Sequence, residues 1–148
     1  MSKKRTHRKK KIFREDDCPT CGTGMIESQG TLSLPVNGEE ISVQNCTYLS
    51  CPKCKEIVLR LDEVRKLREG AIERYRKKYH LLSADEIRSF RERLKLTQAE
   101  LARLLRLGAN TISRWEAGRN VQSQAMDILL RIIRDIPETI DYLQKLAA

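Results

Sequence analysis

Four cysteines, arranged as two Cys-x-x-Cys pairs, are the residues whose type and spacing most clearly indicate chemistry. Cys18 and Cys21 form the first pair, Cys51 and Cys54 form the second, and 29 residues separate the two pairs. A Cys-x-x-Cys turn presents two thiolates to one ion, and zinc prefers four such ligands in a tetrahedron. We therefore predict one structural Zn²⁺ ion per chain, held by these four thiolates.

Other roles for the cysteines are weaker. Four thiolates leave no coordination position open for water, which disfavours a catalytic zinc. A redox dithiol is a lesser alternative, because one such site does not need two pairs. Cys46 has no Cys-x-x-Cys partner and is expected to be a small buried residue rather than a ligand. His7 and His80 lie at the edges of other segments and are poor ligand candidates.

A second pattern covers residues 97–116, which read TQAELARLLRLGANTISRWE. Small Ala102 would let a second helix approach the first, and Ile112 and Trp115 would anchor that second helix in an apolar core. This spacing predicts a helix-turn-helix that docks on double-stranded DNA. The plainer alternative is a helical bundle whose polar face only meets water.

Asn110 and Arg114 are the residues expected to read bases. They lie four apart on one helix face, and their side chains can pair bidentately with adenine and guanine in the major groove. Gln98 opens the first helix of the motif, where its amide and the free backbone N–H groups can meet a phosphate. The candidate DNA-binding residues are Gln98, Ala109, Asn110, Thr111, Ser113, Arg114, Arg119 and Gln122.

The segments around these motifs indicate the elements that position them. Residues 31–34 and 41–48 alternate as strands do, residues 35–38 (PVNG) are typical of a hairpin turn, and residues 57–59 form a third short strand candidate. Residues 62–80 carry an apolar stripe weakened by Gly70 and predict a connecting helix. Capping boxes at Ser83 and Thr97 begin two helices, and further helices are expected over 110–117, 123–134 and 137–146.

The predicted architecture is an α+β chain of two domains. It comprises a basic disordered arm (1–17), a small β-rich zinc-binding domain (18–60), a connecting helix (61–82) and an all-α, repressor-like five-helix domain with the helix-turn-helix (83–148). The apolar stripe Ile136, Ile140, Leu143 and Leu146 of the last helix is either a dimer surface or part of that domain's core.

Charge and composition restrict the function classes. The 148 residues carry a net charge of +9, and residues 1–17 contain eight Lys or Arg against three Asp or Glu. Nucleic acid is therefore the first partner to consider and an anionic membrane the second, while the arm is either a solubilising tail or a phosphate contact. Without a secretory signal or an apolar run of about 18 residues, we expect a cytoplasmic protein that does not span a membrane. No nucleophile–base pair, phosphate loop or open metal site suggests an enzyme.

Residues 83–136 resemble the phage-repressor (Xre-type) helix-turn-helix family. The shared pattern is TQxxLAxxxxxxxxTISxWExG, from Thr97 to Gly118. In the turn, this chain has Arg106 where the family often has glycine, and Gly108 where serine or threonine often follows. A left-handed arginine is mildly costly.

The zinc pattern and the Xre-type pattern together resemble the MqsA (YgiT-type) antitoxins over about residues 18–146. That resemblance implies a zinc-stapled domain that binds a small toxin, commonly an mRNA-cleaving ribonuclease. It also implies a C-terminal domain that forms a homodimer and represses its own operon by binding operator DNA. The zinc ligands would be the four paired cysteines, and Asn110 and Arg114 would read bases. The basic arm and Cys46 are additions to the family pattern.

Two other functions remain open. A stand-alone zinc-containing transcriptional regulator without a toxin could share this architecture. An RNA- or ribosome-associated zinc ribbon would instead use the basic residues between Lys3 and Arg14.

Overall fold

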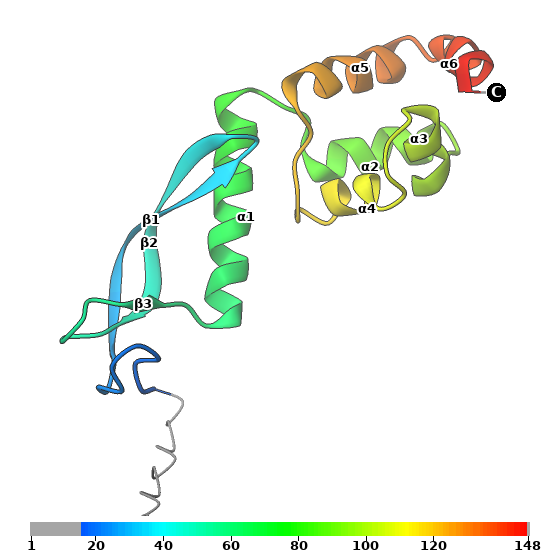
Figure 1. The fold of residues 1–148 in the computed structure, drawn as a ribbon. Coiled ribbons are helices and arrows are strands. Elements are labelled where there is room, and N and C mark those ends of the chain that lie inside the picture. Colours follow the sequence, from blue (N-terminus) through cyan, green and yellow to red (C-terminus); the bar gives the residue numbers. More distant parts are fainter. Residues whose placement is uncertain (1–15, 148) are drawn as a thin grey trace, which may run out of the picture.

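The computed structural model describes residues 16–147, and the expectations for the arm before residue 16 lie outside that range. A three-stranded antiparallel sheet in the order β1-β2-β3 comes first and helices follow, which confirms the α+β class (Figure 1). The strands are β1 (Ile26–Val36), β2 (Glu39–Ser50) and β3 (Ile57–Val58). The helices are α1 (Leu61–Lys78), α2 (Ala84–Arg93), α3 (Gln98–Leu104), α4 (Thr111–Glu116), α5 (Gln124–Asp135) and α6 (Thr139–Ala147).

The sheet is mainly one long hairpin. Val36 pairs with Glu39 across a two-residue turn, in which Asn37 has φ 48° and Gly38 has φ 83°. Two successive left-handed residues match the twist of the flanking strands, so the sequence signal for a hairpin is confirmed. The strands extend beyond the predicted ranges because each supplies the backbone partners of the other, even where the alternation of the sequence is weak.

Helix α1 runs beside the hairpin and covers its turn end (Figure 1). Ala71, Ile72 and Tyr75 of the helix pack with Val36 and Ile41 of the strands. The sequence predicts only a connecting helix here, whereas in the structure its apolar stripe forms half of a small core. The division of the chain into domains at the predicted boundaries remains a prediction.

Gly70, which looked like a weak point of α1, has a packing reason. A Cβ atom at this position would lie 3.1 Å from Cγ1 of Val43 on β2. That distance is tighter than ordinary contact, so the missing side chain lets helix and strand approach closely. The helix propensity that glycine gives up is about 1 kcal/mol relative to alanine.

A larger core lies among the helices after α1. Its fully or nearly buried members come from α2, α3, α4 and α5, from the segment before α2 and from the residue after α3. They are Leu82, Ile87, Phe90, Leu101, Ala102, Leu105, Ile112, Trp115, Leu130 and Ile133. Ile112 and Trp115 are 0% and 4% exposed, which confirms their predicted place in the core. Ile140 and Leu143 of α6 are half-buried and also pack against this cluster, so these two members of the last apolar stripe contribute to the core.

Four successive helices end in the same backbone turn, with one left-handed residue after the last helical turn. The left-handed residues after α1, α2, α3 and α4 are His80 (φ 52°), Lys95 (φ 57°), Arg106 (φ 53°) and Gly118 (φ 66°). After α3, for example, the N–H of Leu107 donates to the carbonyl of Ala102 at 2.8 Å. This is the Schellman arrangement, which satisfies the last carbonyls of a helix. Arg106 therefore adopts the left-handed conformation that the sequence comparison with Xre-type domains suggested.

Candidate metal centre and nucleic-acid interface

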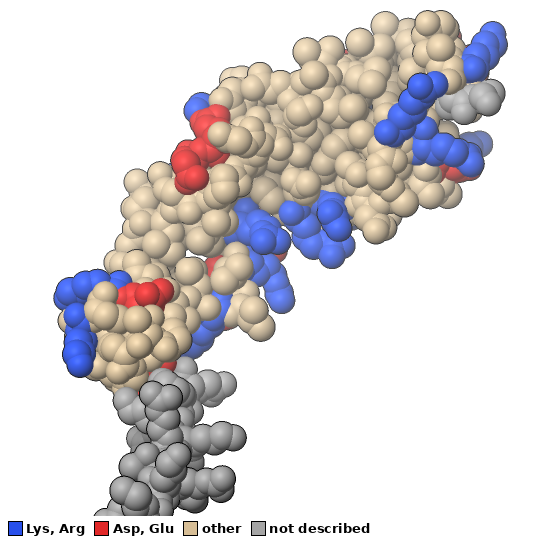
Figure 2. Space-filling view, viewed as in Figure 1, with Lys and Arg blue, Asp and Glu red and all other residues tan. Residues whose placement is uncertain are grey.

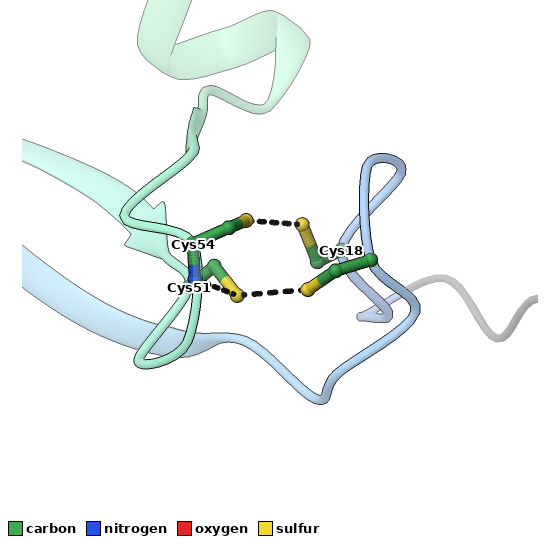
Figure 3. A group of neighbouring side chains, drawn as sticks. Cys18, Cys51 and Cys54 are labelled. Atoms are coloured by element: carbon green, nitrogen blue, oxygen red, sulfur yellow. Dashed lines mark hydrogen bonds between the residues drawn. The ribbon is translucent and has the colours of Figure 1, made fainter.

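The two cysteine pairs meet at the end of the sheet away from the hairpin turn. Their four sulfur atoms all lie within 4.8 Å of one another, and no metal is included in the structure. Figure 3 shows the side chains of two loops pointing toward one another. The sulfurs of Cys18 and Cys54 are 3.4 Å apart. The sulfurs of Cys21 and Cys51 are also 3.4 Å apart.

The two Cys-x-x-Cys turns, here called knuckles, have the same backbone geometry. The carbonyl of Cys18 accepts from the N–H of Gly22 at 2.8 Å, and the carbonyl of Cys51 accepts from the N–H of Lys55 at 3.0 Å. Gly22 and Lys55 are both left-handed, with φ of 71° and 65°. Each turn folds back immediately after its second cysteine, which brings the paired sulfurs to the same side.

Hydrogen bonds prepare two of these thiols for ionisation. The side chain of Thr23 lies 3.3 Å from the sulfur of Cys21, and hydrogen bonds with the side chain and then the backbone of Thr23 are the main causes that lower the pKa of Cys21 to about 6. The backbone N–H of Cys54 lies 3.5 Å from the sulfur of Cys51 and lowers the pKa of that thiol. Lowered pKa values favour the thiolate, which is the form that binds a metal.

Cys54 has the opposite shift. A hydrogen bond with the backbone of Glu56 lowers the pKa of Cys54, but desolvation and the neighbouring sulfurs outweigh it and raise the pKa to about 12. Four thiols this close favour full ionisation only when a cation is shared among them. A tetrahedron with bonds of about 2.3 Å would place its sulfurs about 3.8 Å apart, close to the spacing found here. The four cysteines fit one metal ion, and an all-thiolate set suits zinc.

Cys46 lies outside this group. It is 8% exposed on β2, and its sulfur donates to the carbonyl of Val43 at 3.2 Å. This agrees with the expectation of a small buried residue rather than a fifth ligand.

The predicted helix-turn-helix segment forms α3, a turn and α4. Both capping boxes are present, at Ser83 with Glu86 and at Thr97 with Glu100. Helix α4 begins one residue later than predicted because Asn110, with φ −96° and ψ 6°, is the residue before its first turn. The buried face of α4 packs into the larger core, so the opposite face is left outward.

The candidate DNA-binding residues differ in their exposure. Ala109, Asn110, Arg114 and Arg119 are exposed, while Thr111 and Ser113 are half-buried. The hydroxyl of Ser113 donates to the carbonyl of Asn110 at 3.0 Å.

Gln98 is half-buried and its amide is already engaged. Its Nε2 donates to a carboxylate oxygen of Glu116 at 2.8 Å. The side chain therefore joins the first turn of α3 to the last residue of α4. Any phosphate contact at this position would use the remaining amide hydrogen or the backbone N–H groups.

The structure corrects the prediction that the side chain of Gln122 contacts DNA. Its side chain is fully buried, and its Nε2 donates to the carbonyl of Leu82 at 2.8 Å and to Asp127 at 3.0 Å. An amide held inside the protein cannot reach a DNA backbone. The sequence pattern placed Gln122 after the recognition helix but carried no sign that the chain turns inward there.

Glu116 organises this region, and its importance was missed from the sequence. The side chain is 1% exposed, and its carboxylate accepts from Nε and Nη2 of Arg91 at 2.6 and 3.0 Å. Burial raises the pKa of Glu116, but hydrogen bonds from Arg91 and Gln98 and the charge of Arg88 lower it more, so the net shift is downward. An acid beside a buried Trp115, with Arg88 and Arg91 three residues apart in α2, was the available signal.

Comparison with known proteins decides the family. The family model described as the antitoxin component of a bacterial toxin-antitoxin system, MqsA, matches residues 16–144. The chain belongs to the MqsA antitoxin family. This confirms the resemblance inferred from the paired cysteines and the Xre-type pattern between Thr97 and Gly118.

A curated relative of this MqsA-family chain is Antitoxin HigA-2 from Vibrio cholerae serotype O1. The two are 35% identical over 65 residues, which is 44% of this chain. The matched region spans only 62% of the length of that relative. Within residues 16–147, none of the helices combines the length and apolar character needed to cross a membrane.

Proposed function

We propose that this chain neutralises a partner toxin through its N-terminal zinc-binding part, and that it represses its own operon as a dimer bound to operator DNA. Membership of the MqsA antitoxin family supports the antitoxin role. The printed name of the Vibrio cholerae relative, an antitoxin, supports the same role. The proposal describes a regulator without catalytic activity.

The observation that carries the DNA-binding part is the two-sided character of α4. Ile112 and Trp115 fix one side in the core, while Asn110 and Arg114 are exposed on the other. A helix held from behind and polar in front can enter the major groove, where asparagine and arginine read adenine and guanine. In a dimer, two such helices would meet successive major grooves about 34 Å apart.

Positive charge near the end of α4 supports the same reading. A recess between α1 and the end of α4 is lined in part by Arg65, Arg68 and Arg119. Figure 2 shows basic side chains gathered on the side of the molecule where α1 faces the helical part. We infer that these arginines meet phosphates, which would strengthen binding without reading sequence.

The test uses a duplex from the region upstream of the chain's own coding sequence and an unrelated duplex of equal length. Asn110→Ala and Arg114→Ala should each cost about 1–3 kcal/mol on the upstream duplex and little on the unrelated one. Arg93→Ala on α2 removes the same charge from an exposed position and serves as the control. Equal weakening on both duplexes would show that Asn110 and Arg114 do not read bases.

The proposed dimer surface is an apolar strip of α5 that continues into α6. Ile128, Ile132 and Ile136 are 60%, 40% and 51% exposed and are spaced by four residues. Tyr142 and Leu146 of α6 are also more than half exposed. Exposed apolar side chains at helical spacing are typical of a protein interface. Ile132→Glu should convert the dimer to a monomer in sedimentation equilibrium, whereas a monomeric unaltered chain would refute the dimer.

The alternative is a zinc-containing regulator that has no toxin. Affinity capture with the full chain from its host, followed by an RNA-cleavage assay on the captured protein, separates the two. A stoichiometric small partner whose ribonuclease activity is blocked by the full chain supports the antitoxin proposal. Capture of no ribonuclease by a folded, zinc-loaded chain favours the stand-alone regulator.

A further inference from the structure

The end of the recognition helix is held by a side chain from α1, far away in the sequence. Arg76 is 6% exposed, and its Nη2 donates to the carbonyl of Trp115 at 3.0 Å and to the carbonyl of Asn120 at 3.5 Å. Trp115 lies in α4, and Asn120 lies just after the turn that follows it. A buried guanidinium from one part of the fold therefore reaches two backbone carbonyls of the other.

Helix α4 needs such support because it has only six residues. A helix this short is not stable by itself, and its last carbonyls have no partners within the helix. The carbonyl of Trp115 accepts from the N–H of Gly118 at 3.2 Å and also from Arg76, and the carbonyl of Glu116 accepts from Arg88 of α2 at 3.0 Å. Two positive charges at a helix C-terminus also interact favourably with its dipole.

The chain after α4 is joined to the hairpin as well. Val121 is 3% exposed and belongs to the small core formed by α1 and the hairpin turn rather than to the larger helical core. The side-chain amide of Asn37, in the hairpin turn, donates to the carbonyl of Gln122 at 3.2 Å. Trp115 and Asn120 are thus bonded to α1, Gln122 is bonded to the hairpin turn, and Val121 packs in the core that the two share.

We propose that Arg76 and Val121 are positioning residues. Through them the α1–hairpin layer, which consists of α1, β1 and β2, fixes the orientation of α4 for reading DNA. This proposal rests on the proposed DNA-binding function of α4. Neither residue contacts DNA; each acts through the backbone of residues 115–122. The α1–hairpin layer, which leads to the cysteine cluster, thereby contributes to the sequence specificity of DNA binding.

The first test measures hydrogen exchange without DNA, so it does not depend on the proposed function. In Arg76→Met, the amides of residues 111–122 should exchange about tenfold faster, because a charge-assisted hydrogen bond to α4 is lost. Lys77→Met is the matched control, because Lys77 is exposed and pairs with Glu73 on the same helix. Unchanged exchange in a folded Arg76→Met protein would overturn the proposal.

Two further variants keep the test decisive if Arg76→Met unfolds. Arg76→Lys keeps the charge but not the planar donor group, so exchange at α4 should lie between that of the unaltered chain and that of Arg76→Met. Val121→Ala removes part of the second contact and should speed exchange in the same residues. If both variants are folded and leave α4 unchanged, Arg76 and Val121 do not position it.

The second test compares binding to the upstream duplex with binding to the unrelated duplex. Arg76→Lys and Val121→Ala should reduce the preference for the upstream duplex severalfold while affinity for the unrelated duplex stays within about twofold. If the unaltered chain shows no preference, the proposed function fails and the exchange result alone decides the positioning role. If the unaltered chain shows a preference that both folded variants keep, the positioning proposal fails alone.

Discussion

The hairpin that ends in the cysteine cluster and the helical part after Leu82 differ in how much apolar side chain they bury. The hairpin shares with α1 a small core around Val36, Ile41 and Tyr75, located at its turn end. The helical part buries a continuous cluster that includes Phe90, Leu101 and Leu130. At the cysteine end, two of the buried side chains are Cys18 and Cys51 themselves. One end of the chain therefore depends on four cysteines that fit a metal ion, while the other is stabilised by apolar packing.

Metal removal should separate the two parts most strongly. Zinc sites of this kind contribute roughly 10–16 kcal/mol of apparent binding free energy in small domains. A strong chelator should therefore abolish hydrogen-exchange protection in β1 and β2, while amides around Phe90 and Leu130 remain protected. Cys46→Ala should still bind one zinc ion per chain and serves as the control. Simultaneous loss of protection in both parts would show a single cooperative unit instead.

In the helical part, Glu116 is the residue whose substitution should reduce stability most. Glu116→Gln should cost about 3–5 kcal/mol, because it leaves the buried guanidinium of Arg91 without its charged partner. Urea unfolding of the helical part measures this cost. Glu92→Gln is the control: Glu92 is 61% exposed and 3.4 Å from the same arginine, so its loss should cost less than about 1 kcal/mol.

The pH dependence of the same residue has a definite sign. The pKa of Glu116 is lowered below 4.5 in the folded chain, so ionised Glu116 stabilises the fold above that value. This stability is lost as pH falls through the lowered pKa, because the carboxyl then takes up a proton. The helical part should therefore lose stability below about pH 4.5, and Glu116→Gln should flatten this acid limb. An unchanged acid limb in the variant would assign the loss to other carboxyl groups.

The smallest expected effect concerns the second knuckle. Lys55 is left-handed at the position where the first knuckle has Gly22. Lys55→Gly should stabilise the cysteine end by about 0.5–1 kcal/mol, because glycine adopts this conformation without strain. The chelator concentration that unfolds the hairpin would report the change. Lys53→Gly, one position before Cys54, should give no gain, and an equal gain there would refute the strain argument.

The features that could be predicted from the sequence are those that depend on residues close to one another along the chain. The Cys-x-x-Cys spacing, the Asn37-Gly38 turn and the two capping boxes are local, and all of them appear in the structure. The inward turn at Gln122 depends on Leu82, which lies 40 positions earlier, so no local pattern reveals it. The cover that α1 provides for the hairpin likewise depends on which surface its apolar stripe meets. The DNA contacts themselves remain predictions.

The separation of the two cysteine pairs along the chain has a consequence for the order of assembly. Cys18 and Cys54 are 36 positions apart, and the paired strands β1 and β2 lie between them in the chain. Closing so long a loop before any pairing would be entropically unfavourable. We therefore expect strand pairing to begin at the turn of Asn37 and Gly38 and to proceed toward the cysteines, with metal binding as the last step. Pulsed hydrogen exchange during refolding would show the turn end protected first, and earlier protection at the cysteine end would reverse this order.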